Sequence, residues 1–254
     1  TVVDLNDTPT DVESEVAEER TRRGEETLAS LRDQAADVDV STETQVIETV
    51  DPVHQTIIDY AREHDVDLTV MGTHGRTGLN RLVLGSVTER TLRTSPVPVL
   101  TVHEDTTLDP DFETVLVPTD GSEPANVAAG HGIAFAEAID AAVHVIYVVD
   151  LTDLSGEYGS SKVLQAFEEA GQRAIDDVID RAGDADLRSV EASVLSGTPA
   201  RAILDYAEER DIDCIVMGTQ GRTGLERYFL GSVTEKIVRA ADVPVLTVSP
   251  PEEN

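Results

Sequence analysis

Short apolar runs alternate with amphipathic segments over the second half of the chain. Five runs rich in Val and Ile have the length and composition of buried strands, at residues 114–118, 143–149, 190–195, 214–217 and 243–248. Four segments between them have helical periodicity, at residues 124–138, 162–181, 199–210 and 233–240. Strands that alternate with helices favour a parallel sheet covered on both faces. The pattern therefore predicts an α/β fold with an open, doubly wound sheet of five parallel strands.

The pattern occurs twice, because residues 71–102 are identical to residues 217–248 at 22 of 32 positions. We therefore predict two homologous domains of ordinary size. Copy one covers residues 1–103 and copy two covers residues 113–250, with a linker at 104–112.

Copy one departs from this pattern only at its start. Its other elements are strands at residues 44–50, 68–71 and 97–102 and helices at residues 12–36, 53–64 and 86–93. Residues 1–5 align with residues 147–151, so the first strand and first helix of copy two have no counterpart. Because the first strand is central in such a sheet, we expect the chain to be a fragment of a longer protein. A strand donated by another chain is the alternative.

Each copy carries a glycine loop of the form G-x2-G-x9-G-S after its fourth strand. In copy two the loop contains Gly218, Gly221 and Gly231, and a helical segment begins at Ser232. Glycine lets a ligand approach main-chain N–H groups, and a helix N-terminus attracts anions. The loop therefore predicts a phosphate site. An alternative remains, since Ser232 with Glu235, like Ser86 with Glu89, has the spacing of a capping box, which starts a helix without any ligand.

The predicted topology also places a carboxylate near the glycine loop. Ligands of open α/β sheets bind beyond the carboxyl ends of the strands where the strand order reverses. The loops after strands one and four meet at that point, so Asp120 and Gly218 should face one crevice. Asp120 could instead form an Asx-turn or cap the first helix.

Charge limits the partners of the protein. The chain has a formal net charge of −31, with 50 acidic against 19 basic residues, and only Lys162 and Lys236 are lysines. Such a surface repels nucleic acid and anionic membranes, so we expect neither as a partner. The two glycine loops are locally basic, which favours anion binding there. An acidic chain with few lysines resembles proteins of organisms with molar salt in the cytoplasm, so we expect a halophilic, haloarchaeal source.

Other functional classes receive no support from the sequence. No apolar run approaches the length of a membrane span and no signal peptide is present, so we expect a soluble, cytoplasmic protein. The single cysteine, Cys214, lies in an apolar strand and reads as a buried small residue. The six histidines are scattered, and we predict no metal site.

Several motifs together resemble the universal stress protein family. They are V-P-T-D-G-S at residues 117–122, V-M-G-T-x-G-R-T-G-L in both copies, both G-x2-G-x9-G-S loops and the closing V-P-V-L-T-V. The resemblance covers residues 112–249 and, apart from the absent start, residues 1–103. It implies ATP, with or without Mg²⁺, as ligand, because the intact glycine spacing marks the ATP-binding members.

The resemblance also implies a set of binding residues. In copy two, adenine lies near Pro118, Asp120 and Val148. Ribose and phosphates contact residues of the glycine loop and the following helix, namely Gly218, Gly221, Arg222, Thr223, Gly224, Gly231, Ser232, Val233 and Thr234. In copy one the matching residues are Val2, Gly72, Gly75, Arg76, Thr77, Gly78, Gly85, Ser86, Val87 and Thr88. Copy one has no equivalent of Asp120, so it contains half a site.

The resemblance implies a stress-response protein that binds ATP and regulates its partners or its own assembly. It is not an enzyme on this reading, because no lysine-bearing P-loop and no positioned base for hydrolysis are present. Pairing through strand five would join the two copies or two chains. The alternatives are a nucleotide-dependent ligase of the same superfamily and a regulatory cytoplasmic module of a membrane transporter.

Overall fold

The computed structural model describes residues 1–4, 13–73, 84–104, 106, 112–150, 161–221 and 230–250. The side chains of residues 13–16 and 161 are not described.

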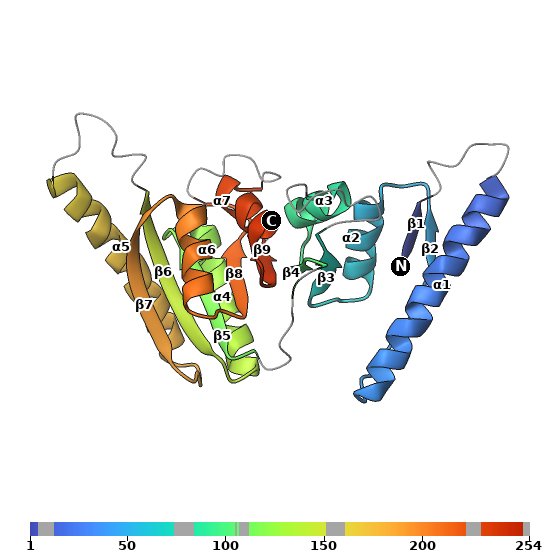
Figure 1. Cartoon of the computed structure of the whole chain (residues 1–254), viewed down its shortest axis with the longest axis horizontal. Helices are drawn as coiled ribbons and strands as arrows, with labels where there is room; N and C mark the ends of the chain where they lie inside the picture. The colour runs from blue at the N-terminus through green and yellow to red at the C-terminus, as the bar shows by residue number, and fades with distance from the viewer. Residues whose placement is uncertain are drawn as a thin grey trace. The chain divides into compact units, whose positions relative to one another are not determined.

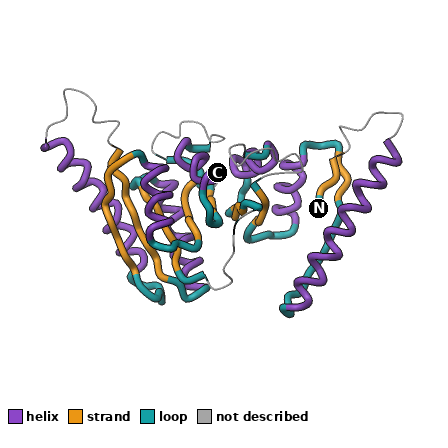
Figure 2. Tube along the Cα trace, viewed as in Figure 1, coloured by secondary structure: helices purple, strands orange, loops and turns teal. Residues whose placement is uncertain are grey.

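Copy two forms the predicted open sheet. Its strands are β5 (Thr114–Thr119), β6 (Ala142–Asp150), β7 (Val190–Gly197), β8 (Cys214–Gly218) and β9 (Val245–Val248). They are mutually parallel in the order β9-β8-β5-β6-β7. Strands and helices alternate along this part of the chain, as Figure 2 shows. The predicted fold class is confirmed, and β5 and β8 are neighbours as the predicted topology requires.

Helices cover both faces of this sheet. Helices α4 (Glu123–Ala138) and α5 (Ser161–Ala182) pack on one face, and α6 (Pro199–Glu209) and α7 (Ser232–Ala240) pack on the other (Figure 1). Alternate residues of β6 explain the two layers, because Val145 belongs to the first hydrophobic cluster and Ile146 to the second. Both residues are fully buried, as expected for a strand with helices on both sides.

Part of copy one extends the sheet of copy two. Strands β3 (Thr69–Gly72) and β4 (Val99–Val102) are parallel to each other, with α3 (Ser86–Thr94) between them in the chain. Strand β4 pairs antiparallel with β9, with Leu100 opposite Leu246. Copy two has the predicted five strands, and β4 and β3 extend the sheet to seven strands among the described residues. Leu92 of α3 is fully buried in the same hydrophobic cluster as α7.

The rest of copy one is a separate compact unit, Thr1–Asp65. It contains β1 (Val2–Asp4), α1 (Glu13–Asp37), β2 (Ile47–Thr49) and α2 (Val53–Glu63). Strands β1 and β2 form a two-stranded parallel sheet. The division has a topological cause. In copy two β5 hydrogen-bonds to both β6 and β8, whereas the described residues of copy one include no counterpart of β5 to connect β1 with β3.

Several element boundaries differ from the prediction for local reasons. Strands β4 and β9 begin two residues later than expected, directly after Pro98 and Pro244, which lack the N–H that a sheet ladder needs. Strand β6 continues through Asp150, which the sequence assigned to a loop. Its last residue therefore has a fixed position at the end of the sheet.

Candidate functional site

A cavity of about 270 Å³ lies over the carboxyl ends of β5, β6 and β8. The structure brings nine of the predicted residues of copy two together around it: Pro118, Asp120, Val148, Gly218, Gly221, Gly231, Ser232, Val233 and Thr234. The other three, Arg222, Thr223 and Gly224, lie outside the described residues. The cavity occupies the topological switch point, because the helix after β5 covers one face of the sheet and the helix after β8 covers the other.

The turn after β5 fixes Asp120 at the edge of this cavity. The Asp120 carboxylate accepts a hydrogen bond from the Ser122 N–H at 3.0 Å, and the Ser122 hydroxyl accepts one from the Ala125 N–H at 3.4 Å. The structure therefore contains the Asx-turn at Asp120, and Ser122 rather than Asp120 caps the first helix of copy two. The second carboxylate oxygen of Asp120 faces Gly221, since a Cβ at Gly221 would lie 2.8 Å from it. Asp120 thus stabilises the turn and lines the cavity at the same time.

The N-terminus of α7 points main-chain donors at the cavity. The N-cap is Gly231, no side chain caps the helix, and Glu235 instead pairs with Arg239. The capping-box prediction was therefore wrong, because the helix begins one residue earlier than a cap at Ser232 requires. The first intrahelical bond runs from the Glu235 N–H to the Gly231 carbonyl. Helix geometry then leaves the N–H groups of Ser232, Val233 and Thr234 without intrahelical acceptors, and such groups favour an anion.

The glycine loop is fastened to this helix by two hydrogen bonds. The Gly231 N–H donates to the Thr219 carbonyl at 2.7 Å, and the Thr234 hydroxyl donates to the Gly218 carbonyl at 2.8 Å. A Cβ at Gly218 would lie 3.0 Å from the Pro124 carbonyl, so only glycine fits between β8 and α4 without displacement. These contacts hold the loop ends at the cavity wall.

Copy one repeats the contacts between the glycine loop and the following helix. The Gly85 N–H donates to the Thr73 carbonyl at 2.8 Å, and the Thr88 hydroxyl donates to the Gly72 carbonyl at 2.8 Å. The N-cap of α3 is Gly85, again without a side-chain cap, so the capping box was wrong here as well. Ser86 and Val87 occupy the first two positions of α3, as Ser232 and Val233 do in α7.

Val2 is the one other predicted residue of copy one that the structure describes. Val2 lies in β1 of the other compact unit. Gly75, Arg76, Thr77 and Gly78 lie outside the described residues.

Sequence reasoning missed several residues that line the cavity. They come from every element around it: Thr119, Ala125, Ile146, Tyr147, Val149, Asp150, Phe167, Pro199, Ile203, Met217 and Gln220. Asp150 could have been found, because it is the first charged residue after the apolar run of β6 and the carboxyl ends of the strands form the site. Phe167 could not, because helical periodicity alone does not show which turn of α5 reaches the cavity.

Other candidate chemistry is absent from the described part of the chain. Cys214 is fully buried, as predicted, and burial raises the pKa of its thiol to about 12. No group of three His, Cys, Asp or Glu side chains among the described residues could hold a metal ion. None of the described helices is long and apolar enough to cross a membrane.

The fold and this cavity define a class: an open, doubly wound α/β domain, duplicated, with a ligand crevice at its switch point. A family model described as the universal stress protein family matches residues 1–103 and 111–249. The chain therefore belongs to the universal stress protein family.

Known relatives agree with this assignment. The chain is 39% identical over 145 residues to the universal stress protein MJ0531 of Methanocaldococcus jannaschii, covering 56% of this chain and 85% of the relative. It is 32% identical over 190 residues to Rv2005c of Mycobacterium tuberculosis, covering 72% of this chain and 62% of that relative. The solved universal stress protein of Archaeoglobus fulgidus has a TM-score of 0.69 at 24% identity, covering 98% of this chain and 85% of its own, and shows the shared fold.

Proposed function

We propose that copy two binds ATP, with or without Mg²⁺, and that the protein acts in the stress response through nucleotide-dependent regulation or partner binding. The observation that carries this proposal is the cavity at the switch point with the N-terminus of α7 open to it. A helix N-terminus with free N–H donors is suited to phosphates, and the apolar ends of β6 and α6 are suited to a base.

The cavity supports an orientation of the nucleotide. The phosphates lie at Gly231, Ser232, Val233 and Thr234, where the helix dipole favours negative charge. The ribose and phosphates contact five residues of the glycine loop: Gly218, Gly221, Arg222, Thr223 and Gly224. Adenine lies toward Pro118, Asp120 and Val148, and Val148 packs against the apolar cluster under α6 and α7.

We propose binding with little or no hydrolysis. The chain has no lysine-bearing P-loop. One oxygen of the cavity carboxylate Asp120 already accepts the Ser122 N–H, which makes that group a poor base for activating water. Release of inorganic phosphate from ATP at a rate typical of enzymes would contradict this part of the proposal.

The experiment is to measure the nucleotide that the protein carries and binds. The protein is purified in high salt and denatured, and the adenine nucleotide released per chain is quantified. Calorimetry then measures the affinity of the nucleotide-free protein for ATP and magnesium. We expect about one ATP per chain from copy two, whereas about two would mean that copy one also binds. No nucleotide and no calorimetric signal would refute the proposal.

A matched pair of variants locates the site. Gly231→Val places a branched side chain where the phosphates approach, and the φ of −58° at Gly231 is one that valine can adopt. We expect affinity for ATP to fall at least about tenfold, since contacts to a charged group are lost. The control is Gly85→Val, the same change at the N-cap of α3 in copy one, which should leave the affinity of copy two unchanged.

We further propose that the two domains pair with each other through β4 and β9. Side chains reinforce this ladder, because the Thr101 hydroxyl donates to the Val245 carbonyl at 3.1 Å and the Thr247 hydroxyl donates to the Val99 carbonyl at 3.2 Å. The His103 ring also contacts the Val238 carbonyl at 2.9 Å, which ties the end of copy one to α7. A monomer by light scattering supports intramolecular pairing, and a dimer indicates pairing between chains.

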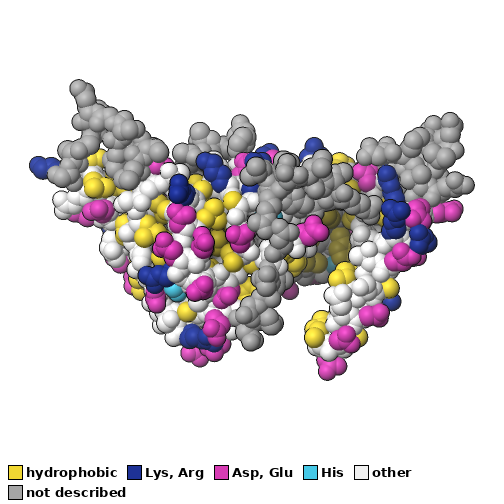
Figure 3. All heavy atoms as spheres, in the orientation of Figure 1, with side chains coloured by type: hydrophobic (Ala, Val, Ile, Leu, Met, Phe, Trp, Pro, Cys, Tyr) yellow, Lys and Arg dark blue, Asp and Glu magenta, His cyan; other side chains and the backbone are white. Residues whose placement is uncertain are grey.

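The charge of the chain supports a proposal about its environment. Acidic side chains are spread over the face shown in Figure 3, and the formal net charge is −31. We propose a cytoplasm of high salt, as in haloarchaea, where screening weakens this self-repulsion. The midpoint of thermal unfolding should then rise as potassium chloride is added, and a midpoint independent of salt would contradict the proposal.

A further inference from the structure

The cavity has two chemically different ends. Gly231 and Ser232, with the N–H donors of α7, form one end. Asp120 stands between the ends, since it follows β5, which lies between β8 and β6 in the sheet, and a Cβ on Gly221 would lie 2.8 Å from its carboxylate. The other end is built from the last residues of β6 and from Phe167 of α5, and it contains a second carboxylate, Asp150.

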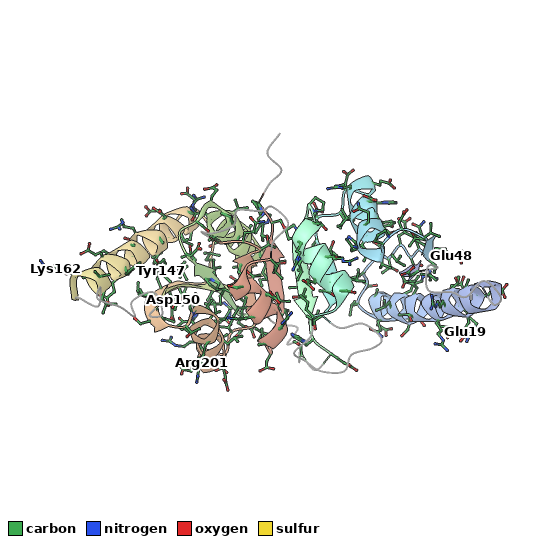
Figure 4. All side chains as sticks on the ribbon, turned by 90° about the horizontal axis from the view of Figure 1, so that it is seen from above. Glu19, Glu48, Tyr147, Asp150, Lys162 and Arg201 are labelled. Carbon is green, nitrogen blue, oxygen red and sulfur yellow. The ribbon has the colours of Figure 1, made fainter. Side chains whose placement is uncertain are left out.

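Asp150 has a defined position at that second end. It is the last residue of β6, it pairs with Gly197 of β7, and it is only partly buried. Alternation along β6 puts Val148 and Asp150 on the same face of the sheet, about 7 Å apart along the strand. Figure 4 labels Asp150 and Tyr147, which both belong to β6. A base that packs on Val148 therefore has Asp150 at its outer edge.

The apolar side chains near Asp150 are suited to the flat ring of a ligand. Ile203 of α6 and Phe167 of α5 line the cavity from the two faces of the sheet, and Val148 belongs with Ile203 to the cluster under α6. A ligand ring held there has its faces covered by apolar side chains, and its edge is left to meet the polar group. In such a site the few polar groups set orientation and specificity.

A carboxylate at the edge of a ligand ring favours ligands that carry a hydrogen-bond donor at that edge. An ionised carboxylate only accepts hydrogen bonds, so it favours an amino group and disfavours an edge without a donor. We propose that Asp150 is a specificity-determining residue that accepts a hydrogen bond from the 6-amino group of the adenine ring. This inference rests on the proposed function, because it requires a nucleotide with its phosphates at α7.

The test compares ATP with purine riboside 5′-triphosphate, which differs from ATP only in lacking the 6-amino group. Calorimetry on the full chain measures both affinities for the wild type and for Asp150→Ala. We expect the wild type to bind ATP about tenfold more tightly than the analogue, and the variant to bind the two within about twofold. Removing one negative charge changes the electrostatic attraction of the triphosphate equally for both ligands, so the ratio of the two affinities, which reports the amino group alone, is the readout.

Control variants separate this role from a general electrostatic effect. Glu168→Ala removes an exposed carboxylate next to Phe167 on α5 and should keep the tenfold preference. Asp150→Asn retains one weaker acceptor and should give an intermediate ratio.

Four outcomes would overturn the inference. If the wild type binds ATP without preferring it to the analogue, or if Asp150→Ala keeps the preference, Asp150 does not recognise the amino group and the proposed function still stands. If the variant instead loses discrimination between ATP and 2′-deoxy-ATP, the carboxylate contacts the ribose and the inference is wrong. Failure of the wild type to bind ATP at all would refute the inference and the proposed function together.

Discussion

The fourth strands of the two copies end in the same three residues, V-M-G, yet they are buried very differently. Val216 of β8 is fully buried, whereas its counterpart Val70 of β3 is 59% exposed. Strand β8 lies between β5 and β9, while among the described residues β3 pairs with β4 alone. Identical local sequence therefore forms the same strand in both places, and the neighbouring strand decides whether it becomes core.

The long helices give the same contrast. Each long helix has a glycine that faces a strand residue: Gly24 of α1 faces Thr1, and Gly171 of α5 faces Tyr147. Thr1 and Tyr147 occupy the same position when the two copies are aligned. With the glycines aligned, Leu31 corresponds to Val178. Val178 is fully buried in the cluster that contains α4, but Leu31 is 52% exposed, because the described residues of copy one include no counterpart of α4.

The largest expected difference between the copies comes from truncating this shared strand. Val216→Ala removes two methyl groups from a closed core and should lower the free energy of unfolding by roughly 2–3 kcal/mol. Val70→Ala should change it by less than about 0.5 kcal/mol, because the side chain is mostly in water. Both residues belong to the second compact unit, so one urea titration followed by circular dichroism compares them. Equal losses would show that β3 is as closed in solution as β8.

A smaller difference is expected at the aspartate that precedes each of these strands, Asp213 before β8 and Asp67 before β3. One Asp213 carboxylate oxygen accepts the N–H groups of Glu113 and Thr114 at 2.9 Å and the Thr114 hydroxyl at 2.8 Å, which fixes the start of β5 against β8. Asp213→Ala leaves the N–H groups of Glu113 and Thr114 without this acceptor and should lower the free energy of unfolding by about 1–2 kcal/mol. The Thr114 hydroxyl keeps the Asp211 carbonyl as an acceptor at 3.0 Å.

The matched control is Asp67→Ala. Asp67 is the exposed counterpart before β3, and we expect its replacement to have almost no effect on urea unfolding. A loss at Asp67 comparable to that at Asp213 would mean that a strand with the role of β5 occupies the edge of β3.

Packing of the long helices provides a third comparison. A Cβ at Gly171 would lie 2.5 Å from the ring of buried Tyr147, so Gly171→Ala should destabilise α5 by about 1 kcal/mol even after its gain in helix propensity. Gly24→Ala meets only the end of the exposed Thr1 side chain, which can rotate away, so α1 should be unchanged or slightly more stable. Hydrogen exchange of the two helices, followed by mass spectrometry, separates these effects. A larger increase in the exchange rate of α1 after Gly24→Ala than of α5 after Gly171→Ala would contradict this account.

The smallest effect concerns a histidine of copy two that has no counterpart in copy one. Burial between β6 and α6 lowers the pKa of His144, whose ring lies 3.1 Å from the Tyr206 hydroxyl. Because the unfolded chain then takes up the proton more readily, stability should be greatest above about pH 6.5, the ordinary histidine value, and fall as the pH drops through it. Urea unfolding at pH 7.5, 6.5 and 5.5 measures this slope.

Two variants test whether His144 causes this dependence of stability on pH. His144→Gln should flatten it, whereas His131→Gln, at an exposed position on α4, should leave it unchanged. A slope that persists in His144→Gln would place the acid sensitivity elsewhere in the chain.

Much of the site could be predicted from sequence because its chemistry is local. The glycine spacing predicted a loop before a helix N-terminus, and Gly218, Gly221 and Gly231 do line one cavity. The capping box failed because S-x-x-E spacing does not show whether the helix begins at the serine or one residue before it. Phe167, Pro199 and Ile203 escaped prediction because they reach the cavity from helices whose rotation and depth depend on packing.

The sequence alone determined the duplication, the order of strands and helices, and the pairing of a glycine loop with a helix start in each copy. Those features follow from residue type and spacing, which act over one turn or one strand. Only the tertiary structure decided that β4 and β9 join in one sheet, that copy one is divided between two compact units, and that Asp150 stands at the far end of the cavity. These depend on contacts between residues far apart in the chain, and such contacts are set by which strand edges and helix faces find a partner.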